Sequence, residues 1–238
     1  FRLYDVNWDN SVHLHPDERF VVMVDTGIAW PSSIAQYFDS ATSPLNPYNR
    51  NFGNFVYGTV PIFLLKLVGT LLRRDTYDGA LLVGRVLSAL SDIGSVWLLF
   101  LAARRLYDER VALLASAFLA LSTLGIQLSH FMAVDTFTVF FLMLSFYYAV
   151  RLMKEGGWLP ALEAGFAIGL ALACKLSIAM APLFVVGALF TRIVQTWPQA
   201  GPAMAPMAGG AEDAFVFPGL GWQARSPETT AAPARTRP

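Results

Sequence analysis

Two adjacent carboxylates stand near the start of the chain, in the run HLHPDER at residues 13–19. Asp17 and Glu18 follow Pro16 in a polar, aromatic-rich stretch just ahead of several membrane-length apolar segments. A carboxylate beside a bilayer can serve as a general base for a substrate that the membrane holds. The alternative is an acidic pair on a solvated loop, or one that caps a helix beginning near Arg19.

The same run offers nitrogen and oxygen ligands. His13, His15 and Asp17 alternate, so on an extended strand they would point to one side, with Glu18 nearby. Such a set can bind a divalent cation, but the spacing is weakly specific and no second ligand cluster accompanies it. A metal cofactor at His13 and His15 is therefore an alternative and not the main expectation.

A third acidic residue, Asp135, begins the apolar run VDTFTVFFLMLSFYYAV. An acid at the start of a membrane span is costly unless it faces water, a partner or a site, and the competing interpretation is helix N-capping. His130 lies five residues upstream, where it can pair with Asp135 or with a phosphate, or simply be a polar residue at the membrane interface.

Two cations are candidates for holding a phosphate. Arg85 lies near the outer end of an apolar segment, and Asp92 follows it by two helical turns, so both share one helix face. Asp92 is expected to be a structural hydrogen-bonding group. Lys175 interrupts a later apolar run and can extend to headgroup level, either to contact a phosphate or to anchor the chain.

The composition predicts a multi-pass membrane protein. The chain is 55% hydrophobic and 14% charged, with a mean hydropathy of +0.48. Its formal net charge is zero and it has no basic block, which argues against a nucleic-acid partner. The one cysteine, Cys174, lies in an apolar run and is expected to be a core residue.

Apolar segments of spanning length occur at residues 81–103, 110–129 and 134–152. The stretch 159–193 is too long for one span, and a straight helix would carry Lys175 through the bilayer centre. We therefore predict two short helices that meet at Lys175, and about five spans in an all-α bundle.

Basic residues predict how the bundle is oriented, because Lys and Arg accumulate in cytoplasmic loops. They flank alternate turns of the bundle, at Arg104, Arg105 and Arg110, at Arg151 and Lys154, and at Arg192. Residues 1–80 and the turn at 129–134 are then extracytoplasmic, and Lys175 is a basic exception among the short turns on that side.

The segments outside the spans differ in composition. Prolines and Gly53 punctuate residues 20–56, which indicates an ordered loop with short helices, and residues 57–74 are expected to lie along the interface. The last 41 residues, 198–238, hold seven of the fourteen prolines and are predicted to be disordered, and the tail region 196–238 is predicted to be disordered or artefactual. The resulting regions are 1–80, 81–195 and 196–238.

An ordered series of motifs resembles the phospholipid-carrier-dependent glycosyltransferases of the protein O-mannosyltransferase and aminoarabinose-transferase superfamily. The series is NWD, HPDERF, SPLNPYN, FVYGTVPIFLL, GRVLSALSD, RRLYD and SHFMAVDTFTVFF. The resemblance implies a GT-C-like membrane bundle and a sugar donor on polyprenyl phosphate, with a lipid, glycan or protein as acceptor. It matches Asp17 and Glu18 to the acidic catalytic pair and Asp135 to a second acid. Protein-modifying relatives often carry an arginine where this turn offers His130.

The resemblance also implies that this chain is an N-terminal piece of a longer protein, because the family typically has a dozen or so spans. The opening FRLYDVNWD reads as the exit from a preceding span. A non-enzymatic transporter or assembly subunit, or an inactive truncated fragment, is the alternative function. Transporters usually place ionisable groups near the midplane within inverted repeats, whereas here they gather at one surface and no repeat is evident.

Overall fold

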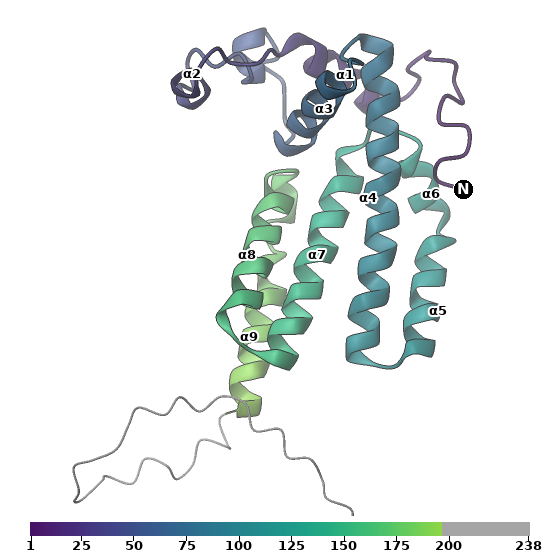
Figure 1. Ribbon diagram of the computed structural model, residues 1–238, viewed down its shortest axis with the longest axis vertical. Helices are drawn as coiled ribbons and strands as arrows, with labels where there is room; N and C mark the ends of the chain where they lie inside the picture. Colours follow the sequence, from purple (N-terminus) through teal and green to yellow (C-terminus); the bar gives the residue numbers. More distant parts are fainter. Residues whose placement is uncertain (197–238) are drawn as a thin grey trace, which may run out of the picture. The chain divides into compact units, whose positions relative to one another are not determined.

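Helix α4, Tyr77–Leu106, is the axis of the structure, a computed structural model that describes residues 1–196. Thr76 caps its first turn by accepting a hydrogen bond from the Gly79 backbone N–H (3.2 Å). Arg104 and Arg105 occupy its last turn, where cations suit the helix dipole. Other helices pack against α4 along its length (Figure 1).

The remaining elements of the bundle run beside α4 or beside its neighbours (Figure 1). Gly156 and Gly157 have φ values of 72° and 91°, which glycine adopts without a Cβ penalty and which allow the tight turn between α7 and α8. In chain order these elements are α5 (Glu109–Ala120), α6 (Thr123–Ser129), α7 (Val134–Glu155), α8 (Trp158–Leu172), η2 (Leu176–Ile178) and α9 (Pro182–Thr196).

Three helical stretches among the described residues are long and apolar enough to cross a membrane, namely α4, α7 and Leu176–Thr196. This confirms the predicted spans at 81–103 and 134–152, and also the predicted break at Lys175. The stretch 110–129 is not one straight helix, because α5 and α6 meet at a bend of 57°. Ser122 is extended there and begins α6, as serine favours helix starts.

The prediction of about five spans is therefore too high for the described residues. By length and composition there are three, or four if the bent pair α5 and α6 is one span. Helix α8 has 15 residues, and at 1.5 Å per residue it extends about 22 Å, less than the roughly 30 Å of a bilayer core.

A layer of short elements lies across one end of these helices (Figure 1). It contains α1 (Pro16–Gly27), α2 (Ile34–Phe38), η1 (Pro47–Arg50) and α3 (Val60–Leu71). The predicted loop with short helices is thus confirmed. With 12 residues, α3 is about 18 Å long, too short to cross a bilayer, which agrees with the prediction for residues 57–74.

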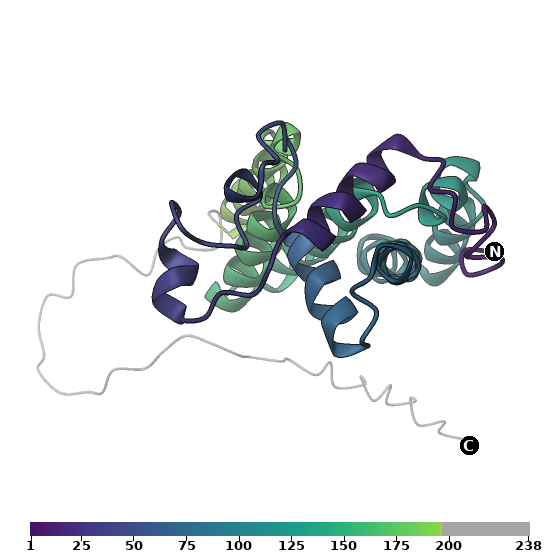
Figure 2. The same cartoon turned by 90° about the horizontal axis from the view of Figure 1, so that it is seen from above.

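A hydrophobic core fixes this layer to the bundle. Seen from above, α1 and α3 approach α4 from different sides and meet at one end (Figure 2). Val24 of α1, Leu65 of α3 and Phe137 of α7 are buried in one cluster. Because interiors of this kind pack closely, α1 and α3 hold fixed positions on the ends of α4 and α7.

The two ends of the bundle differ in the basic residues of their short turns, although residues 1–76 also carry Arg2, Arg19, Arg50, Lys66, Arg73 and Arg74. We call the end that carries residues 1–76, the turn at 130–133 and Lys175 the loop end. The opposite end, which we call the basic end, carries Arg104, Arg105, Arg151, Lys154 and Arg192. At the basic end Arg105 pairs with Glu155 (2.5 Å). The predicted disorder of 196–238 concerns residues that lie, apart from Thr196, outside the described part.

Candidate functional site

A buried arginine ties the loop end together. The Arg85 guanidinium of α4 donates to both carboxylate oxygens of Glu18 (2.8 and 2.7 Å), to both of Asp9 (2.9 Å each) and to the Val6 carbonyl (2.9 Å). Glu18 also accepts the Met132 backbone N–H (2.8 Å). Hydrogen bonds donated by Arg85 lower the pKa of Asp9 to about 2. The network joins the N-terminal segment, α1, α4 and the turn before α7.

This network gives the adjacent acids different positions. Successive residues of a helix differ by about 100°, so when Glu18 points into the core, Asp17 points to the surface. Glu18 has 0% exposure and Asp17 is exposed. The structure therefore leaves Asp17 accessible to a substrate and commits Glu18 to Arg85.

The prediction that Arg85 contacts a donor phosphate does not fit this geometry. Arg85 has 0% exposure, and its five N–H groups all have partners. A phosphate would have to displace a buried carboxylate to reach it. Arg85 instead positions α1. Asp92, expected to be structural, pairs with Arg2.

The two remaining acids approach a tyrosine that the sequence did not single out. Tyr57 is half-buried beside Phe20 and Phe55, with ring centroids 6.5 and 6.0 Å away. Burial raises the pKa of the Tyr57 phenol, and the negative charges of Asp17 and, more weakly, Asp135 raise it further. Both carboxylates therefore lie within electrostatic range of one side chain, although 118 positions separate them in the chain.

A cation completes this cluster. Lys175 Nζ donates to Asp135 Oδ1 at 2.6 Å, and their side chains are 36% and 47% exposed. The alternative role of Asp135 as a helix N-cap is wrong, because Ala133 is the N-cap of α7 and no side chain caps it. An ammonium group has three protons, so Lys175 can hold Asp135 and still donate to an anion.

A backbone contact brings Tyr57 to Lys175. The Gly58 N–H donates to the Cys174 carbonyl (2.9 Å), and the Val60 N–H donates to the Ala173 carbonyl (3.3 Å). A Cβ atom on Gly58 would lie 1.9 Å from the Ala173 oxygen, so only glycine permits this approach. The segment before α3 is thereby docked on the end of α8. Cys174 is buried, as predicted.

The histidines have other partners. His130 lies against two backbone carbonyls, with Nδ1 2.7 Å from the Ile126 oxygen and Nε2 3.0 Å from the Tyr4 oxygen. It therefore holds the N-terminal segment on α6. The predicted pairing of His130 with Asp135 is not present within residues 1–196, and binding of a phosphate by His130 stays a prediction.

His13 and His15 do not form the alternating ligand set. His13 has φ of 57°, in the left-handed region, which breaks the extended geometry that the prediction required. Its Nε2 lies 3.2 Å from Asp78 Oδ1, whereas His15 caps α1 through Nδ1 and the Glu18 N–H (3.4 Å). Within residues 1–196 no three His, Cys, Asp or Glu side chains are grouped so as to hold a metal ion.

The family model described as dolichyl-phosphate-mannose-protein mannosyltransferase matches residues 60–207, more than half of the chain. The chain belongs to this family. It is accordingly a membrane glycosyltransferase of the mannosyltransferase type with a multi-pass GT-C fold, and the family implies a lipid-linked sugar donor. No curated protein and no solved structure gives a significant match.

The matched range divides the cluster. Asp135 and Lys175 lie inside it, whereas Asp17, Glu18 and Tyr57 precede it. The roles of the acidic pair therefore depend on their geometry and on the motif resemblance. They remain predictions.

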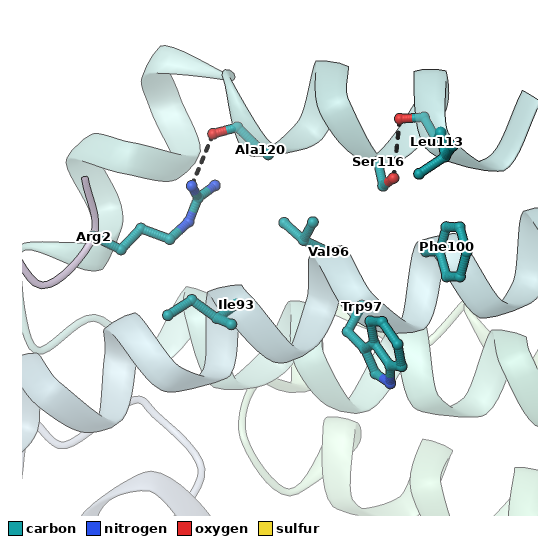
Figure 3. A pocket seen from close by; sticks show the side chains of 8 residues that line it. All are labelled: Arg2, Ile93, Val96, Trp97, Phe100, Leu113, Ser116 and Ala120. Atoms are coloured by element: carbon teal, nitrogen blue, oxygen red, sulfur yellow. Dashed lines mark hydrogen bonds between the residues drawn. The ribbon is translucent and has the colours of Figure 1, made fainter. Parts of the chain in front are cut away.

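A hollow between α4 and α5 offers no groups comparable to those of the acidic cluster. It has a volume of about 400 Å³, and its two polar residues, Arg2 and Ser116, already have partners. Arg2 pairs with Asp92 and donates to the Ala120 carbonyl (2.8 Å), and Ser116 donates to the Leu113 carbonyl (Figure 3). The other side chains of the lining are apolar except for the indole N–H of Trp97, and they belong to Ile93, Val96, Trp97, Phe100 and Leu113.

Proposed function

We propose that the loop end transfers a sugar from a polyprenyl-phosphate carrier to an acceptor hydroxyl on the extracytoplasmic side of the cell membrane. The observation that carries the proposal is the pair of Lys175 and Asp135 (2.6 Å) beside the docked segment at Gly58, whose neighbour Tyr57 packs on Phe20 of α1. Phe20 lies about one helical turn from Asp17, and the charges of Asp17 and Asp135 both raise the pKa of Tyr57. An accessible carboxylate, a phenol and an ammonium then lie around one exposed region. These are the groups that proton transfer and departure of a phosphate require.

Asp17 is the proposed general base. The acceptor hydroxyl oxygen attacks the anomeric carbon and forms the new glycosidic bond, while its proton passes to the Asp17 carboxylate. The bond from the anomeric carbon to the phosphate oxygen breaks, and its electron pair leaves with the lipid phosphate. Tyr57 lies near enough to Asp17 to orient the acceptor.

Lys175 and Asp135 serve the leaving group in this proposal. A departing phosphate monoester gains negative charge, and a nearby ammonium stabilises that charge more strongly where water is scarce. Asp135 holds the Lys175 ammonium at 2.6 Å and so fixes its position. The pair also explains why Lys175 interrupts an apolar stretch.

Glu18, Arg85 and Asp9 act as positioning residues. They do not reach the surface, but they fix the first turn of α1 and thereby the direction of Asp17. Preorganisation of this kind contributes to rate by holding the base in place before the substrate arrives.

The proposed side of the membrane follows from the basic end. Because Lys and Arg favour the cytoplasm, the basic end is cytoplasmic and the loop end faces outward. A protein with this orientation meets the carrier lipid in the outer leaflet.

The proposal is tested by measuring sugar transfer from mannosyl phosphoryl polyprenol by the protein in membranes. Asp17→Asn should lower the rate at least about 100-fold, the usual contribution of a general base, without changing thermal stability. Asp39→Asn, an exposed acid of the same layer, is the matched control and should retain transfer. Undiminished transfer by Asp17→Asn would refute the assignment of the base.

A further inference from the structure

A second candidate binding site adjoins the acidic cluster. It is a hollow of about 360 Å³ between α2, the segment after it and the start of α3. Volumes of this order are typical of small-molecule sites. The lining residues are Tyr37, Phe38, Ser40, Ser43, Leu45, Asn46, Pro47, Thr59 and Phe63.

The lining combines aromatic rings with uncharged polar groups. Tyr37 and Phe38 pack edge to face and remain 45% and 77% exposed, so their rings are available to a ligand. Ser43 is only 4% exposed, and its hydroxyl forms no hydrogen bond within residues 1–196. The Thr59 hydroxyl likewise accepts no capping hydrogen bond from the first turn of α3, although Thr59 is the N-cap residue of that helix.

No charged side chain lines the hollow. Between Trp30 and Phe55 the charged residues are Asp39 and Arg50. Asp39 accepts from the Thr42 hydroxyl (2.7 Å) and the Ala41 N–H (3.1 Å), and Arg50 donates to the Gly27 carbonyl (2.7 Å). A ligand that depends on charge therefore finds no counterpart here.

We propose that this hollow binds an uncharged sugar ring of the acceptor, which makes the acceptor a glycan or glycolipid. Sugar rings present C–H faces that stack on aromatic side chains and hydroxyl edges that bond serine, threonine and asparagine. The inference rests on the proposed function, because it names the acceptor class for the same site.

The position of the hollow suits an acceptor. Thr59 lines it and Tyr57 belongs to the acidic cluster, so the two regions are separated by two residues of backbone. At about 3.5 Å per residue this is at most about 7 Å. This limit brings the backbone at the edge of the hollow close to Tyr57, and in the proposal a glycan whose ring lies in the hollow extends another hydroxyl toward Asp17.

The polar lining favours a sugar over an acyl chain. A hydrocarbon in the hollow would cover the Ser43 and Thr59 hydroxyls without giving them partners, which costs free energy for each group. The Asn46 amide, bonded to Ser40 and Tyr48, still has one N–H and one lone pair unused.

The test measures binding apart from catalysis. The protein is placed in phospholipid nanodiscs, because maltoside detergents would compete, and saturation-transfer NMR is recorded with methyl α-mannoside and methyl β-glucoside. The wild type should transfer saturation to ring protons of at least one glycoside. Tyr37→Ala should raise the dissociation constant about tenfold through loss of the stacking face, and Thr59→Val about threefold through loss of a hydroxyl.

Tyr107→Ala is the matched control, since Tyr107 is 69% exposed at the basic end. It should bind both glycosides as the wild type does. The inference is overturned if neither glycoside binds, or if the three variants bind equally. Because binding does not need Asp17, loss of transfer in Asp17→Asn with failed glycoside binding would leave the proposed function intact and remove only this inference.

Discussion

A buried acid in α1 gives a prediction with a definite sign. Asp25 has 0% exposure, and neither of its carboxylate oxygens has a hydrogen-bond partner within residues 1–196. Burial raises its pKa from 3.8 to about 6, although the Lys66 charge on α3 opposes this effect and Asp75 adds slightly to it. The folded protein therefore retains the proton of Asp25 up to a higher pH than the unfolded chain does.

The direction follows from which state binds more protons. Between pH 3.8 and about 6 the folded state retains a proton that the unfolded state has lost, so the free energy of unfolding decreases as the pH rises. The two pKa values differ by about two pH units, and at 1.36 kcal/mol per unit the loss is about 3 kcal/mol. The loss is complete above the folded pKa.

Asp25→Asn removes this ionisation and tests it. Unfolding measured in detergent micelles should show equal stability of variant and wild type near pH 4, and an advantage for the variant of about 3 kcal/mol near pH 8. Asp39→Asn is the control with opposite sign, because hydrogen bonds from Thr42 lower the pKa of Asp39. A difference between Asp25→Asn and wild type that does not change from pH 4 to pH 8 would show that Lys66 fully compensates the carboxylate.

Two further substitutions test how the site is held. Glu18→Gln should lower the free energy of unfolding by about 3 kcal/mol, because it leaves the buried Arg85 charge poorly compensated, whereas Asp17→Asn should not change it; equal effects in chemical unfolding would contradict the assigned positions. Gly58→Ala should cost about 1–3 kcal/mol by forcing two backbones apart, and Gly53→Ala, where a Cβ atom meets nothing within 4 Å, should be neutral. Equal melting temperatures for the two alanine variants would argue against the docked segment.

Much of the fold follows from the length of apolar runs. The sequence predicted α4 and α7 because each run suffices for a span, and it predicted the break at Lys175 because an ammonium at mid-membrane is costly. The bend between α5 and α6 was missed, since Leu121 and Ser122 continue an apolar pattern and the cap preference of one serine is a weak signal. The predicted five spans were not confirmed, because α8 is too short to cross a bilayer.

The site was predictable in part. The motifs indicated Asp17 and Asp135, and the charge rule placed them at one end, where the structure brings both toward Tyr57. The partners of Arg85 could not be predicted, because they depend on how residues 6–18 fold back over α4. Tyr57 lies in a loop without periodicity, and its proximity to Lys175 arises from the contact between Gly58 and Cys174. The catalytic roles of Asp17 and Asp135 stay predictions.

The first turn of α1 sets a limit on how this motif can change in length. Because Glu18 is fixed by Arg85 and the Met132 N–H, a single residue inserted between Asp17 and Glu18 would rotate Asp17 by about 100° around the helix axis. An insertion in the segment between α1 and α2 leaves that register intact. Insertions should therefore be tolerated in the segment between α1 and α2 and rejected between Asp17 and Glu18.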